Sequence, residues 1–72
     1  MIINIRYSVT MKPMRVHVLD NDMVEATTDR LGILLDFKNP RLLKNGNTLQ
    51  LDQTLAQAGI LEGDTLEIEE AA

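Results

Sequence analysis

The sequence predicts a single α+β domain in which a few short strands pack against one helix. Residues 2–11 alternate apolar and polar side chains, as a half-buried strand does. Val24, Thr27 or Thr28, and Leu31 recur at helical spacing. A second alternation, at residues 65–69, follows a glycine-capped turn. The chain has 72 residues, which is room for one hydrophobic core, so residues 1–72 are expected to form one domain.

The first two predicted strands form a hairpin. On the strand at residues 2–11, one face carries Ile3, Ile5, Tyr7, Val9 and Met11. Lys12-Pro13 interrupts this pattern, because proline fixes φ and lacks a backbone donor. Residues 14–19 then alternate again, and their two faces are Met14, Val16 and Val18 against Arg15, His17 and Leu19. Two such strands joined by a short turn favour antiparallel pairing.

One helix is predicted from Met23 to Leu31. Asp22 and Glu25 have the spacing of a capping box, with aspartate in place of the usual serine or threonine. Gly32 is the predicted C-cap, since glycine adopts the left-handed conformation at little cost. Residues 33–39 are predicted as a connector, and the sequence leaves open which of its apolar residues are buried: Ile33, Leu34, Leu35 and Phe37.

A second hairpin is predicted around Asn45-Gly46, the strongest tight-turn signal in the chain. It joins a short strand at residues 41–44 to a brief strand that contains Leu49 and Leu51. The chain then makes a helical turn at residues 54–58, which ends at Gly59.

The last predicted strand covers residues 65–69 and follows a turn at Glu62-Gly63-Asp64. Leu66 and Ile68 share one face of it. The predicted core combines the apolar faces of all the elements: Ile3, Ile5, Val16, Val18, Val24, Leu31, Leu42, Leu55, Ile60, Leu66 and Ile68.

Composition argues against several classes of function. The chain has no cysteine, and His17 is its only histidine, so we predict no catalytic, cofactor-binding or metal-binding residues. A net charge of −4 argues against a nucleic-acid partner. No apolar run reaches the length of a membrane span, so direct membrane insertion is not expected. These observations predict a cytoplasmic protein without enzymatic activity or cofactor, whose partners are proteins and whose oligomeric state is open.

The order of the elements and a set of motifs resemble ubiquitin-like β-grasp proteins. The pattern covers nearly the whole chain, and from Thr54 to Leu66 the motif residues stand at the spacing found in the second half of ubiquitin. The shared residues are Arg41-Leu42-Leu43, Asn45-Gly46, Leu49, Thr54-Leu55, Ile60 and Thr65-Leu66. The resemblance implies a mixed sheet of four to five strands crossed by one short α-helix.

Within this superfamily the chain looks most like the YukD/EsaB proteins, small accessory components of bacterial type VII secretion systems. The pattern that carries the likeness is Leu55, Gly59-Ile60, Gly63-Asp64 and Leu66-Glu67-Ile68. The resemblance implies a non-catalytic interaction module that serves a secretion system. One alternative is a small subunit of a multicomponent enzyme, because ubiquitin-like subunits also occur in bacterial monooxygenases. A less favoured alternative is a relative of the modifiers and sulfur carriers that lacks their Gly-Gly tail.

The chain departs from ubiquitin at two places. It reads Ile68-Glu69-Glu70-Ala71-Ala72 where modifiers and sulfur carriers end in Gly-Gly, so activation of the tail by an adenylating enzyme is not expected. Leu43 matches one position of ubiquitin's apolar patch, but Glu67 and Glu69 stand at the others. Ubiquitin-type receptors are therefore not expected as partners.

The predicted protein-binding residues share the sheet face that points away from the helix. In a β-grasp sheet this face would carry Arg6, Arg15, His17, Arg41, Leu43, Glu67 and Glu69. Because the first and last strands pair in parallel in this fold, Arg6 is expected beside Glu67 or Glu69. Two interpretations stay open: the face docks a protein, or its charges only keep an open sheet face soluble.

Overall fold

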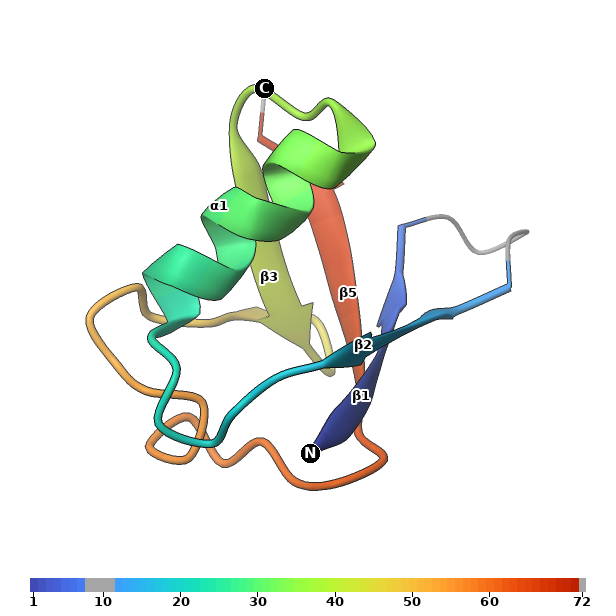
Figure 1. The fold of residues 1–72 in the computed structure, drawn as a ribbon. Coiled ribbons are helices and arrows are strands. Elements are labelled where there is room, and N and C mark those ends of the chain that lie inside the picture. The colour runs from blue at the N-terminus through green and yellow to red at the C-terminus, as the bar shows by residue number, and fades with distance from the viewer. Residues whose placement is uncertain (8–11, 72) are drawn as a thin grey trace.

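The computed structural model describes residues 1–7 and 12–71, which form one five-stranded sheet with a helix across one of its faces (Figure 1). In chain order the elements are β1 (Ile2–Arg6), β2 (Met14–His17), α1 (Val24–Leu35), β3 (Pro40–Lys44), β4 (Asn47–Thr48) and β5 (Thr65–Glu70). The strand order is β2-β1-β5-β3-β4. β1 and β5 pair in parallel at the centre and the other neighbours pair antiparallel, which confirms the predicted mixed sheet.

The β1–β2 hairpin is antiparallel, as predicted, and pairs Ile3 with Val16. β1 ends at Arg6, and Tyr7 lies exposed beyond it instead of continuing the buried face. Val9 and Met11, which were assigned to the same strand, lie outside the described residues.

The core lies between the sheet and α1 and consists of ten buried apolar residues, all of them predicted: Ile3, Ile5, Val18, Val24, Leu31, Leu42, Leu55, Ile60, Leu66 and Ile68. The remaining predicted core residue, Val16, is only half-buried and packs against this cluster. Period-two alternation in the strands and helical spacing in α1 located most of this core, because each pattern places apolar side chains on one face. Leu55 and Ile60 lie outside the strands and α1.

The prediction for the end of the helix was wrong. α1 continues to Leu35, so it has 12 residues and is not short. The C-cap is Asp36, which has φ 60° and ψ 39° in the left-handed region. Gly32 lies inside the helix, where a Cβ atom would come within 2.4 Å of Cγ of Pro40. This glycine therefore allows close contact between α1 and the start of β3.

The predicted capping box at the start of the helix is also wrong. The carboxylate of Asp22 accepts a hydrogen bond from the N–H of Leu19 at 2.9 Å, and no side chain caps α1. The first N–H groups of the helix donate to backbone carbonyls of the loop before residue 54, including a 2.8 Å bond from Val24 to Gln53. The missing acceptors thus come from a segment distant in sequence, which no local motif indicates.

The turn of the second hairpin forms as predicted. Asn45 and Gly46 have φ of 53° and 81°, the positive values that a type I′ turn requires. The strand after it was placed too late: β4 covers Asn47–Thr48, Leu49 is half-buried beyond it, and Leu51 is exposed in the following turn.

Candidate protein-docking surface

The predicted binding residues do share the sheet face opposite α1. Strand register aligns Arg6 with Glu67, Glu67 with Leu43, and Arg41 with Glu69. Arg15 and His17 lie on β2, at the edge of the same face. Six of the seven residues are exposed: Arg6, Arg15, His17, Arg41, Glu67 and Glu69.

Arg6 stands beside Glu67 in the parallel β1–β5 pairing, as predicted. The ion pair recorded on this face within the described residues joins Arg41 to Glu69, with a 2.6 Å bond from Nε to Oε1. Both side chains are about half exposed, so the pair contributes roughly 0–1 kcal/mol to stability.

Leu43 was predicted as the apolar member of the docking face, and the structure corrects this. Only 9% of the residue is exposed, although its side chain lies on the face away from α1. Its strand neighbours there are Glu67 of β5 and Thr48 of β4. The centre of the open face therefore offers charge and little apolar contact area.

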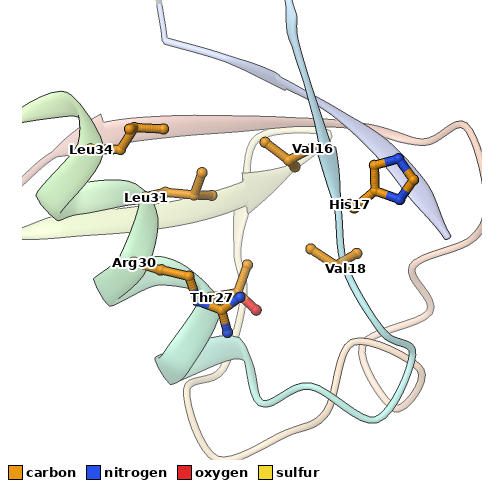
Figure 2. A pocket seen from close by; sticks show the side chains of 7 residues that line it. All are labelled: Val16, His17, Val18, Thr27, Arg30, Leu31 and Leu34. Carbon is orange, nitrogen blue, oxygen red and sulfur yellow. The ribbon is translucent and has the colours of Figure 1, made fainter.

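An apolar groove lies at one side of the sheet, between α1 and β2 (Figure 2). This groove has a volume of about 320 Å³. We call it the α1–β2 groove, and it is lined by Val16, His17, Val18, Thr27, Arg30, Leu31 and Leu34. Figure 2 shows the side chain of Val16 directed toward α1, with the ring of His17 on the other side of the strand.

Sequence reasoning missed this groove because it depends on the true length of α1. Leu34 was assigned to a connector, but the helix continues past it and places it three residues after Leu31, on the same side. Leu34 is 66% exposed at the groove, and its neighbour Ile33, 83% exposed, lies outside it. Leu35 and Phe37 are half-buried against the core, which answers the question that the sequence left open.

β2 is an edge strand with unused backbone groups along the groove. Met1 and Val18 exchange both backbone hydrogen bonds, at 2.7 and 2.9 Å. Along an antiparallel ladder, hydrogen-bonded residue pairs alternate with non-hydrogen-bonded pairs. Arg15, opposite Asn4, and His17, opposite Ile2, therefore belong to non-hydrogen-bonded pairs. Their N–H and C=O groups point away from β1, to the side on which the described residues place no strand.

The charges beside this edge are positive although the whole chain is acidic. Arg15 is exposed on the open face of β2, and Arg30 of α1 lies at the groove. The edge thus combines backbone groups, apolar side chains and cationic side chains within one surface. This arrangement suits the binding of a protein segment.

Residues 1–7 and 12–71 contain no group of three His, Cys, Asp or Glu side chains that could hold a metal ion. None of their helices is long and apolar enough to cross a membrane.

Comparison with known proteins identifies the fold. The sequence matches no protein-family model and no curated protein. The structure is similar to that of the ubiquitin of Caldiarchaeum subterraneum, with a TM-score of 0.85 and 24% sequence identity, over 100% of this chain and 94% of that one. The chain therefore has a ubiquitin-like β-grasp fold, as the motifs of its second half predicted.

Proposed function

We propose that the chain is a non-catalytic protein-interaction module that binds an extended segment of its partner along β2. One observation carries this proposal: the open edge of β2 runs beside the α1–β2 groove. A segment that adds to a sheet edge gains affinity from backbone hydrogen bonds and specificity from pockets for alternate side chains. Both features are present here on the same strand.

The geometry defines the chemistry of the bound segment. Its backbone would bond to the N–H and C=O groups of Arg15 and His17. Every second side chain would enter the α1–β2 groove and should be aliphatic, to match Val16, Leu31 and Leu34. The other side chains would lie on the open face beside Arg15 and His17 and should be acidic.

The rest of the open face extends this surface. Arg6, Arg41, Glu67 and Glu69 are exposed and would contact parts of the partner that lie beyond the added strand. Leu43 is excluded from the surface because it is buried.

The test is a nuclear magnetic resonance titration of the isotope-labelled chain with a synthetic peptide of alternating valine and aspartate. We expect the largest shift changes on β2 and on the groove side of α1. Leu34→Asp should weaken binding about tenfold or more, because the charge enters the apolar groove. Ile33→Asp is the matched control, since Ile33 is the adjacent, more exposed residue outside the groove.

Two outcomes would contradict the proposal. Equal loss of binding in Leu34→Asp and Ile33→Asp would show that the groove does not hold the peptide. Equal binding of a valine–lysine peptide, with its shift changes on β2 and in the α1–β2 groove, would show that Arg15 and Arg30 do not select acidic segments.

We also propose that the protein partner belongs to a bacterial type VII secretion apparatus and is met in the cytoplasm. Support comes from the YukD-like pattern of Leu55, Gly59-Ile60 and Gly63-Asp64. The genes beside the one that encodes this chain provide the test. A secretion ATPase and WXG-type substrates are expected there, and oxygenase subunits in their place would contradict the secretion role.

A further inference from the structure

Two turns at the end of the sheet where β1 begins have the same sequence pattern and the same hydrogen bonds. In Leu19–Asp22, the N–H of Asp22 donates to the carbonyl of Leu19 at 3.0 Å, and Leu19 donates back to the Asp22 carboxylate at 2.9 Å. In Leu61–Asp64 the corresponding distances are 3.0 and 2.8 Å. Each turn therefore fixes the backbone of its leading leucine on both sides.

The two leucines are exposed and line the same groove. Leu19 is 63% exposed and Leu61 is 67% exposed. They line a groove of about 470 Å³ together with Ala56 and the buried Ile60, and we call it the two-turn groove. Two large apolar side chains from distant parts of the sequence are thus held side by side in water. Because the backbones of both leucines are already fixed, a partner that covers their side chains would cost this chain little conformational entropy.

The rim of the two-turn groove is acidic. In each turn an acidic residue follows the leucine, Asp20 in one and Glu62 in the other, and both line the groove. The Glu62 carboxylate lies 3.1 Å from the N–H of Ile2, which fixes its position. Lys44, the cation beside this end, is bonded to the Asp64 carboxylate and to the carbonyl of Gly59. Met1 also lines the groove, and its ammonium group donates to the carbonyl of Val18 at 2.7 Å. The two carboxylates outnumber this ammonium group, so the net charge offered to a ligand is negative, opposite to that along β2.

We propose that the two-turn groove binds a basic amphipathic segment of a protein partner. Apolar side chains of the segment would cover Leu19 and Leu61, and lysine or arginine side chains would pair with Asp20 and Glu62. A second copy of this chain fits poorly, because the acidic rims of the two copies would face each other. An anionic membrane surface is repelled by the same carboxylates.

This inference goes beyond the proposed function, because it concerns another part of the molecule and the opposite ligand charge. The α1–β2 groove selects an acidic extended segment, and the two-turn groove selects a basic one. A module with both surfaces can hold two partners together, or two segments of one partner.

The experiment uses the full chain and a short synthetic amphipathic peptide of leucine and lysine as the probe. Chemical-shift titration should map the peptide to Leu19, Asp20, Leu61 and Glu62. Leu19→Ser and Leu61→Ser should each weaken binding by about tenfold. The double variant Asp20→Asn, Glu62→Gln retains the leucines and should bind more weakly, with much less dependence on salt concentration.

Matched controls separate this surface from the one along β2. Leu51→Ser removes an exposed leucine outside the two-turn groove and should bind the leucine–lysine peptide as the native chain does. Arg15→Ala should also leave this binding unchanged, so failure of the β2 proposal is distinguishable from failure of this one. A leucine–glutamate peptide of the same pattern should not bind.

Several results would overturn the inference. They are the absence of any shift with the leucine–lysine peptide, shifts that map elsewhere, and equal binding by the leucine–glutamate peptide. Native affinity of both Leu19→Ser and Leu61→Ser for the leucine–lysine peptide would also overturn it. Co-sedimentation of the chain with phosphatidylserine-containing vesicles would assign the groove to a lipid surface instead.

Discussion

Two segments of this molecule end in the same hydrogen-bond motif, but their glycines have different roles. At the end of α1, Asp36 donates to the carbonyl of Ile33 at 3.3 Å, and Phe37 donates to Gly32 at 2.8 Å. This is the Schellman pattern, in which the left-handed residue is usually glycine. Here that residue is Asp36, while the glycine lies within the helix.

The helical turn that begins at Thr54 ends in the more usual way. Gly59 has φ 79° and donates to Ala56, and Ile60 donates to Leu55, both at 3.0 Å. Leu55 and Ile60 are also buried in the core, which supplies the apolar contact that often accompanies this motif.

The comparison shows that a glycine near the end of a helical pattern has two possible reasons. Gly59 is needed for its backbone conformation, and a side chain there would meet nothing within 4 Å. Gly32 is needed for the space it leaves to Pro40. Only the first reason can be recognised from the neighbouring sequence.

The largest expected effect tests the apolar contact of the second segment. Leu55→Ala should lower the free energy of unfolding by about 2–5 kcal/mol, because a fully buried leucine leaves a cavity when it is truncated. Denaturant unfolding followed by circular dichroism measures this loss. A loss below roughly 0.5 kcal/mol, the size typical of surface changes, would mean that the turn is not part of the core.

Gly32→Ala tests the packing role of the helix glycine. Alanine gains about 1 kcal/mol in helix propensity, but its Cβ would clash with the ring of Pro40, and overpacking of this kind costs about 1–3 kcal/mol. We expect a net destabilisation of roughly 1 kcal/mol, measured by denaturant unfolding.

The double variant with Pro40→Ala provides the control for this change. If the clash is the cause, Gly32→Ala should be neutral or stabilising in the Pro40→Ala background. The same destabilisation in both backgrounds would assign the effect to the helix backbone instead.

Exchange of the two cap residues tests the conformational role. Asp36→Gly should stabilise the protein by about 0.5 kcal/mol, because glycine adopts positive φ without a Cβ penalty. Gly59→Asp should destabilise it by about 1 kcal/mol for the converse reason. Thermal unfolding midpoints that move in the same direction for both variants would contradict this account.

The smallest expected effect concerns Lys44, which bonds to Gly59 at the end of the helical turn that begins at Thr54. Lys44 Nζ donates to the Gly59 carbonyl at 2.8 Å and to the Asp64 carboxylate at 3.0 Å. The pKa of Asp64 is lowered from 3.8, first by the hydrogen bond from the Leu61 N–H and then by the bond from Lys44. A carboxyl group with a lowered folded-state pKa stabilises the fold above its unfolded pKa and loses that contribution as pH falls through the folded value.

Asp64→Asn should therefore destabilise the protein by about 0.2–1 kcal/mol at neutral pH. The difference from the native chain should shrink once the pH falls below 3.8. Unfolding curves recorded at neutral and acidic pH measure this difference in stability. A difference that persists unchanged in acid would exclude the charge of the Asp64 carboxylate as the cause of the destabilisation.

Predictions from sequence succeeded for several features that depend on neighbouring residues, although the local capping box at Asp22 was wrong. Alternation in β1 and β5 located the core, and Asn45-Gly46 located a turn, because side-chain direction and φ are local properties. They failed wherever the role depends on a distant segment. Gly32 is explained by Pro40, and the start of α1 is satisfied by Gln53.

The candidate surface follows the same division. The members of the open face were predicted, because a period of two assigns each strand residue to one side. The burial of Leu43 was not predicted, since it depends on side chains of neighbouring strands. The α1–β2 groove was missed because it forms only when α1 extends to Leu34 and faces the edge strand.

The position of β5 between β1 and β3 has a consequence for synthesis of the chain on the ribosome. β5 is the last strand in sequence, yet it is the element that joins the β1–β2 hairpin to the β3–β4 hairpin. A nascent chain that has emerged only as far as Asp64 holds two hairpins with no strand between them. The two hairpins can therefore join into one sheet only after residues 65–70 have emerged from the ribosome.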